Sequence, residues 1–149
     1  KNNYTLTSIE TDKTAYRSAK KFLNREKVNL LHGRIIEISD LPNPKNIDFI
    51  KFGMSPENIE WFYQDIRRYR KTKNIFKDID KKYDFILFDG GEFSTFAEFL
   101  KLYNQTKYFG LDDIFDYKQY EVLKYIAEHK SYFKLIKTTQ DFSIFKVNN

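Results

Sequence analysis

The sequence predicts an α/β fold: a three-layer sandwich with a mostly parallel sheet and a C-terminal antiparallel hairpin. Short apolar runs typical of strands alternate with segments in which apolar residues recur every three or four positions. Such alternation is typical of parallel strands joined by helical crossovers. The last two strand-like segments, Tyr132–Thr138 and Phe142–Val147, are separated by three polar residues, which predicts a hairpin.

The N-terminal segments predict a β-α-β unit. Tyr4–Ile9 is the first expected strand, and either Thr11 or Asp12 can cap the helix that follows it. Val28–Ile36 is the second strand candidate, although His32-Gly33-Arg34 interrupts its apolar pattern. We therefore expect the first two strands to be parallel.

The middle of the chain predicts a loop and a long helix. Prolines and a glycine mark Leu41–Met54 as a loop. Ser55 then suits a helix cap and Pro56 the first helical position. Basic residues gather at the end of this helix, within Arg67–Lys73, where cations complement the helix dipole. A phosphate-binding role for this basic segment is the alternative.

The most informative stretch follows, from Tyr83 to Ile114. Phe85–Phe88 is a continuous apolar run closed by Asp89 and two glycines, which predicts a strand buried on both faces. Thr95 and Glu98 have the spacing of a capping box for the next helix. Tyr108–Leu111 repeats the strand pattern, so the stretch predicts one βαβ unit.

Carboxylates end both strands of this unit. Asp89 follows the first strand, and Asp112 and Asp113 follow the second. Parallel strands joined by a crossover end at the same edge of a sheet, where open α/β sheets bind ligands. We expect the three carboxylates to be neighbours in space and to mark a site at this edge. Capping of the following turns is the structural alternative.

One more helix precedes the hairpin, predicted by a second capping-box spacing at Asp116 and Gln119. No repeat, low-complexity segment or composition change divides the chain. Residues 1–149 are therefore predicted to form a single domain.

Composition narrows the class of protein. The 149 residues are 41% hydrophobic and 18% aromatic, which argues against disorder. Because cysteine is absent, a disulfide framework and a cysteine nucleophile are excluded. No apolar run is long enough to cross a bilayer, so we expect a cytoplasmic protein without a membrane partner. A net charge of +5 is moderate, and we do not expect nucleic acid as a partner.

Three motifs carry a resemblance to a known family: Ser8–Asp12, Leu31–Arg34, and Phe88–Phe93 followed by Leu111–Asp113. In these motifs and in the order of its elements, the chain resembles class I S-adenosylmethionine-dependent methyltransferases, a Rossmann-like family. The small bacterial O-methyltransferase-like proteins are the members it resembles most. The resemblance runs from the family's second strand to its last.

The resemblance assigns roles to individual residues. It implies that Glu10 binds the cofactor ribose and that Gly33 and Arg34 flank the adenine. It implies cofactor contact and catalysis at Asp89, and binding of Mg²⁺ or another divalent cation at Asp89, Asp112 and Asp113, whose oxygen ligands suit such an ion. Glu92, three residues beyond Asp89, is the candidate general base.

The sequence also departs from the family. The family's first strand and glycine-rich turn have no counterpart, and Gly-x-Gly occurs nowhere in the chain. We expect that an N-terminal portion has been removed, with loss by the protein itself as the alternative. A missing central strand would expose apolar edges, so we also expect either inactivity or completion by another copy in a homo-oligomer.

The resemblance implies an enzyme that transfers a methyl group from S-adenosylmethionine to a hydroxyl of a small molecule or sugar. The alternative is a non-catalytic methyltransferase-like domain that serves binding or scaffolding. A basic nucleic-acid binder using Arg67–Lys73 is a third hypothesis.

Overall fold

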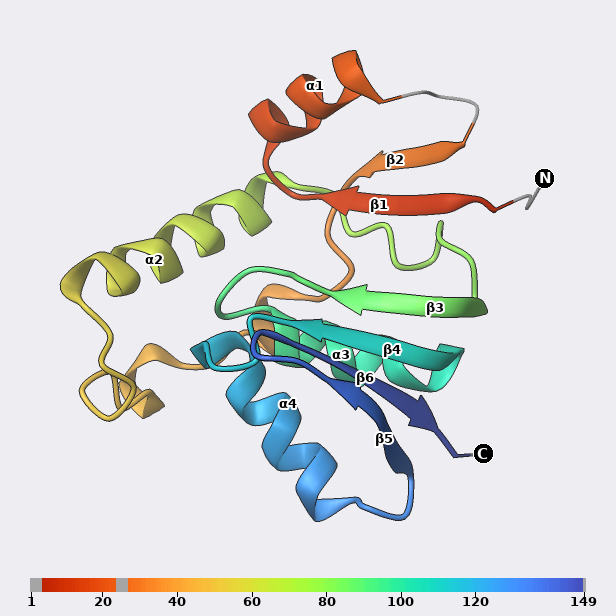
Figure 1. Ribbon diagram of the computed structural model, residues 1–149. Helices are drawn as coiled ribbons and strands as arrows, with labels where there is room; N and C mark the ends of the chain where they lie inside the picture. Colours follow the sequence, from red (N-terminus) through yellow and green to blue (C-terminus); the bar gives the residue numbers. More distant parts are fainter. Residues whose placement is uncertain (1–3, 24–26, 149) are drawn as a thin grey trace.

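The computed structural model describes residues 4–23 and 27–148. The order of elements agrees with the predicted alternation of strands and helices, ending in two consecutive strands (Figure 1). The strands and helices are β1 (Leu6–Glu10), α1 (Lys13–Phe22), β2 (Val28–His32), α2 (Pro56–Lys71), β3 (Tyr83–Phe88), α3 (Thr95–Leu102), β4 (Thr106–Asp112), α4 (Tyr117–Glu128), β5 (Phe133–Thr138) and β6 (Phe142–Val147). Short 3₁₀ turns, η1 (Ile38–Asp40), η2 (Pro44–Asn46) and η3 (Tyr103–Gln105), lie in the connections.

The predicted single, mostly parallel sheet is wrong. The strands form a two-stranded sheet, β1-β2, and a separate four-stranded sheet with the order β3-β4-β6-β5. The pairs β1-β2 and β3-β4 are parallel, whereas β4-β6 and β5-β6 are antiparallel. The hairpin inserts β6 between β4 and β5, so half of the strand pairs are antiparallel. The Rossmann-like three-layer sandwich is therefore not the fold of this chain.

The sheet divides between β1 and β3, which run in the same direction in Figure 1 but are not hydrogen-bonded neighbours. Strand β3 consequently lies at an edge instead of the predicted interior, and Phe85 and Leu87 are 45% and 51% exposed. Helices α3 and α4 cover only the face of β3 that carries Phe88. The face that carries Phe85 and Leu87 is exposed, so the prediction of a strand buried on both faces is wrong. Apolar sheet edges favour association, so the expected homo-oligomer stays a prediction.

Two of the predicted helix caps form and two do not. The Asp12 carboxylate accepts hydrogen bonds from the backbone of Thr14 and Ala15 and begins α1. Ser55 and Asn58 form a capping box at the start of α2. In α3 and α4 the expected boxes are absent, because the side chains that would close them bind elsewhere in the tertiary structure.

The main core lies between the four-stranded sheet and the helices α3 and α4. Phe99 of α3 is fully buried there, and its ring centroid lies 5.4 Å from those of both Phe88 and Phe109. A smaller core of Ile47, Phe62 and Phe93 lies where α2 and the η2 segment meet the start of α3. These two cores fix the turn after β3 between them. In the parts of the chain that the structure describes, no helix is long and apolar enough to cross a membrane.

Candidate metal centre

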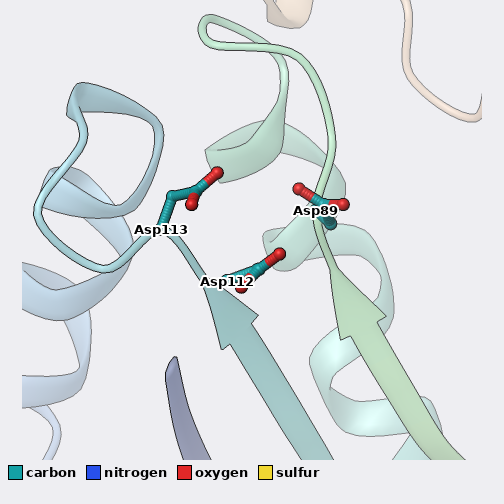
Figure 2. A group of neighbouring side chains, drawn as sticks. All are labelled: Asp89, Asp112 and Asp113. Carbon is teal, nitrogen blue, oxygen red and sulfur yellow. The ribbon is translucent and has the colours of Figure 1, made fainter. Parts of the chain in front are cut away.

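The structure brings the three predicted carboxylates together. Asp89 follows β3, Asp112 ends β4 and Asp113 begins the next turn, and their side chains surround a common space (Figure 2). One carboxylate oxygen from each residue lies within 4.8 Å of the others. Because β3 and β4 are parallel neighbours, their carboxyl ends lie at the same edge, as predicted. We call these three residues the carboxylate cluster.

A lysine that the sequence analysis did not select joins this cluster. The Lys118 ammonium donates hydrogen bonds to Asp89 Oδ1 and Asp113 Oδ2, each at 2.8 Å. Its side chain is only 7% exposed, whereas each of these two aspartate side chains is 50% exposed. The ammonium therefore lies beneath two carboxylates that reach solvent.

The bound aspartates keep this lysine charged. Burial acts to lower the pKa of Lys118, but the hydrogen bonds to Asp113 and Asp89 outweigh it and raise the pKa. A raised lysine pKa stabilises the fold at every pH below the unfolded value, and this contribution disappears only as pH rises through the folded value. Lys118 is thus a permanent cation rather than a general base. With three carboxylates and one ammonium, the ionised cluster keeps a formal charge of −2.

Gln119 fixes the distance between the two strand ends. Its amide nitrogen donates to the carbonyls of Phe88 and Asp112, both at 2.9 Å, and its side chain is fully buried. The predicted box with Asp116 does not form because the amide binds these strand carbonyls instead. Lys118 and Gln119, consecutive in α4, therefore bind the side chains and the backbone of the same edge.

The two glycines after Asp89 are closely packed against acidic side chains. A Cβ on Gly90 would lie 2.5 Å from Glu98 Oε2, and one on Gly91 would lie 3.1 Å from Asp65 Oδ2. The turn therefore lies against two acidic side chains of α3 and α2. The predicted capping role of Glu98 is replaced by a 2.8 Å hydrogen bond from the Tyr69 hydroxyl.

Burial raises the pKa values of these two acidic side chains, Glu98 and Asp65. Glu98 keeps some exposed surface, but its carboxylate is buried, and burial raises its pKa despite the opposing hydrogen bonds from Tyr69 and Ser94. Burial likewise raises the pKa of Asp65, against the influence of Arg68. Both carboxyls thus hold protons more tightly in the folded chain than in the unfolded one.

Glu92 lies beside the cluster rather than in it. It lines a pocket of about 360 Å³ between α3, α4 and the η1–η2 segment, and Lys118 lines the same pocket. Burial and the neighbouring Asp116 raise the pKa of Glu92, and the backbone N–H groups of Lys118 and Tyr117, together with the charge of Lys118, oppose the rise. We call this cavity the α3–α4 pocket.

The residues expected to bind the cofactor nucleoside lie apart, near the ends of β1 and β2. The Glu10 carboxylate accepts the Asp12 N–H at 2.7 Å. Gly33 packs against Ile75, which a Cβ would approach to 2.5 Å. Arg34 donates to the Thr72 carbonyl at 3.1 Å.

Arg34 also contacts two residues that follow it closely in the chain. Its guanidinium donates to the Ile36 carbonyl and forms an ion pair with Glu37 at 2.8 Å. These contacts give Glu10, Gly33 and Arg34 structural roles, and their predicted cofactor roles stay predictions.

Comparison with known proteins found no match, whether with family models, with curated proteins or with solved structures. The methyltransferase resemblance therefore rests on the quoted motifs alone.

One sequence signal could have identified Lys118. A lysine in the first turn of a helix opposes the helix dipole, which favours anions there. Lys118 is the second residue of α4 and follows Asp113 by five positions. A cation in that unfavourable place, just after an acidic pair, is expected to have a carboxylate partner.

Replacing the buried lysine should destabilise the fold in a pH-dependent way. We expect Lys118→Met to cost about 1–2 kcal/mol near pH 7, a value reduced from that of fully buried pairs because the aspartates are half exposed. Because the pKa of Lys118 is raised on folding, the loss should be present in full at every pH below the unfolded lysine value of 10.5 and should shrink only as pH rises through the folded value. Urea unfolding from pH 7 upwards measures it. Lys124→Met, an exposed lysine of the same helix, is the control, and equal losses in both variants would contradict the role of Lys118.

Replacing Glu98, whose carboxylate is buried, should instead stabilise the fold, and the gain should depend on pH. A carboxyl whose pKa is raised on folding costs stability as pH rises from the unfolded value, 4.5, to the folded one. Glu98→Gln keeps an acceptor for Tyr69 and does not titrate, so it should gain stability over wild type above about pH 4.5. Unfolding free energies at pH 4 and pH 8 test this, with exposed Glu128→Gln as control. A difference from wild type that is the same at both pH values would refute it.

Proposed function

We propose that the chain is an enzyme that binds a divalent cation at Asp89, Asp112 and Asp113 and acts on an oxygen-bearing small molecule. The observation that carries this proposal is the convergence of three carboxylate oxygens within 4.8 Å. Carboxylates are the ligands that Mg²⁺ and Ca²⁺ prefer, and both ions tolerate waters in their remaining positions.

Charge and distance both support a divalent ion. The formal charge of −2 that remains after Lys118 is counted equals the charge of one such ion in magnitude. The carboxylate oxygens lie within 4.8 Å of one another, whereas ligands in adjacent positions around Mg²⁺ or Ca²⁺ are about 3–3.4 Å apart, so the side chains would close around either ion by rotation. The half-exposed side chains of Asp89 and Asp113 leave room for solvent or substrate.

The surrounding residues suit chemistry at an oxygen. A divalent cation polarises a bound oxygen and lowers the pKa of its proton. Glu92, whose pKa is raised by burial, is the proposed acceptor of that proton, since a raised pKa brings a carboxylate closer to the range of an effective base. Lys118 and Gln119 hold the ligands in place and do not exchange protons.

Metal binding should stabilise the fold by mass action. At a free Mg²⁺ or Ca²⁺ concentration of 100 times Kd, we expect the unfolding free energy to rise by about 2.7 kcal/mol. Asp112→Asn should remove most of this gain because one ligand oxygen and one charge are lost. Thermal unfolding with increasing metal, checked by calorimetric titration, measures both effects.

Lys118 provides a test with the opposite sign, because its ammonium competes for the same carboxylates. Lys118→Met should lower the metal Kd, whereas Asp112→Asn should raise it. Asp84→Asn, an exposed carboxylate of β3 outside the cluster, should leave the Kd unchanged. If wild type and Asp112→Asn respond equally to metal, the cluster is not the site.

Methyl transfer from S-adenosylmethionine to a hydroxyl of a small molecule or sugar is the second candidate. It is supported by the acids Glu10 and Asp89, which follow or end strands that run in the same direction on either side of the sheet division (Figure 1). The family resemblance gives these two acids cofactor contacts. A chain that binds S-adenosylmethionine without turnover would instead fit the non-catalytic binding or scaffold domain.

Glu10 decides whether this second candidate is sound. Glu10→Ala should weaken S-adenosylmethionine binding by about 1–3 kcal/mol, the usual cost of losing hydrogen bonds to a charged group. Glu10→Gln separates this effect from folding, because its amide oxygen can still accept the Asp12 N–H. Calorimetry that finds no binding, or equal affinity in all three proteins, removes the cofactor assignment.

A further inference from the structure

We propose that the α3–α4 pocket binds a small organic cation, an amine or a methylated ammonium carrying an apolar group, through Glu92 and its aromatic neighbours. This inference does not depend on the metal site. The α3–α4 pocket has a volume of about 360 Å³, which is in the range of small-molecule sites.

The apolar part of the pocket is rigid and aromatic. Phe93, Phe96 and Tyr117 line it, together with Ile47. Phe93 and Ile47 belong to the smaller core, and the ring centroids of Phe93 and Tyr117 lie 5.6 Å apart. Because tertiary packing fixes these rings, they form a preorganised wall for an apolar group. The face of such a ring also attracts a cation.

The charged residues that line the pocket are mostly acidic. Three carboxylates, Asp40, Glu92 and Glu121, line it together with one ammonium, Lys118. The ammonium is engaged by the carboxylate cluster, so it offers little to an anionic ligand. The carboxylates therefore dominate the field inside the pocket.

Glu92 differs from the other two carboxylates of the pocket, which form salt bridges with lysines. Asp40 pairs with Lys101 at 3.2 Å and Glu121 with Lys124 at 3.7 Å. Among the residues that the structure describes, no lysine or arginine forms a salt bridge with Glu92. It is partly buried beside Asp116, and burial followed by that charge raises its pKa. A ligand cation would relieve both unfavourable effects.

Matched probes of opposite charge test this inference. Phenethylamine, 2-phenylethanol and phenylacetate share one ring and differ in the charge of the side group. In calorimetric titrations with EDTA present, we expect the amine to bind at least tenfold more tightly than the alcohol, and phenylacetate not to bind. Equal binding of amine and phenylacetate, or no amine binding, overturns the proposal. Because EDTA removes metal, the result is independent of the proposed cation site.

Two variants locate the binding. Glu92→Gln should weaken amine binding at least tenfold, whereas Glu128→Gln, at the other end of α4, should not change it. Asn46→Arg adds a cation to the wall of the pocket at an exposed position, so folding should be unaffected. It should weaken the amine and permit phenylacetate to bind. If neither Glu92→Gln nor Asn46→Arg changes the preference, the amine binds elsewhere and the proposal fails.

Discussion

A buried ammonium group connects helix α4 to the ends of strands β3 and β4. Lys118 of α4 binds carboxylates beyond β3 and β4 at 2.8 Å, and the adjacent Gln119 binds backbone carbonyls of the same strands. Removing either the Lys118 or the Gln119 side chain leaves charges or carbonyls without partners, and this costs more free energy than the hydrogen bonds themselves contribute. The position of α4, the separation of the strand ends and the geometry of the carboxylate cluster all depend on these two residues.

The same arrangement places two different surfaces side by side. Above Lys118 lies an acidic edge open to solvent, with a formal charge suited to a divalent ion. Next to it lies the α3–α4 pocket, with an aromatic wall and the carboxylate of Glu92, which forms no salt bridge within the described part of the chain. Lys118 belongs to both surfaces, and its ammonium is hydrogen-bonded to Asp89 and Asp113 of the carboxylate cluster.

The divided sheet explains why Asp89 is accessible. Strand β3 is the edge of the four-stranded sheet, so the turn that carries Asp89 has β4 and Asp112 on only one side. The glycines that follow allow this turn to lie against Glu98 and Asp65, whose buried carboxyls hold protons tightly. Burial therefore favours protonation of these two carboxyls beneath the turn, next to the carboxylate cluster at the rim.

Local chemistry determined much of this protein. Apolar periodicity located the strands and helices, and Asp12 and Ser55 marked two helix starts, because these features depend on neighbours in sequence. The short βαβ connection likewise placed Asp89 beside Asp112 and Asp113. Tertiary structure alone decided that the sheet divides between β1 and β3, since strand pairing depends on which edges meet in space. Tertiary structure also decided three side-chain contacts. Glu98 accepts a hydrogen bond from Tyr69 and Gln119 binds strand carbonyls, instead of capping their helices. Lys118 binds aspartates at the strand ends. Side chains of this length reach several partners, and burial selects the one that leaves the fewest charges and carbonyls unpaired.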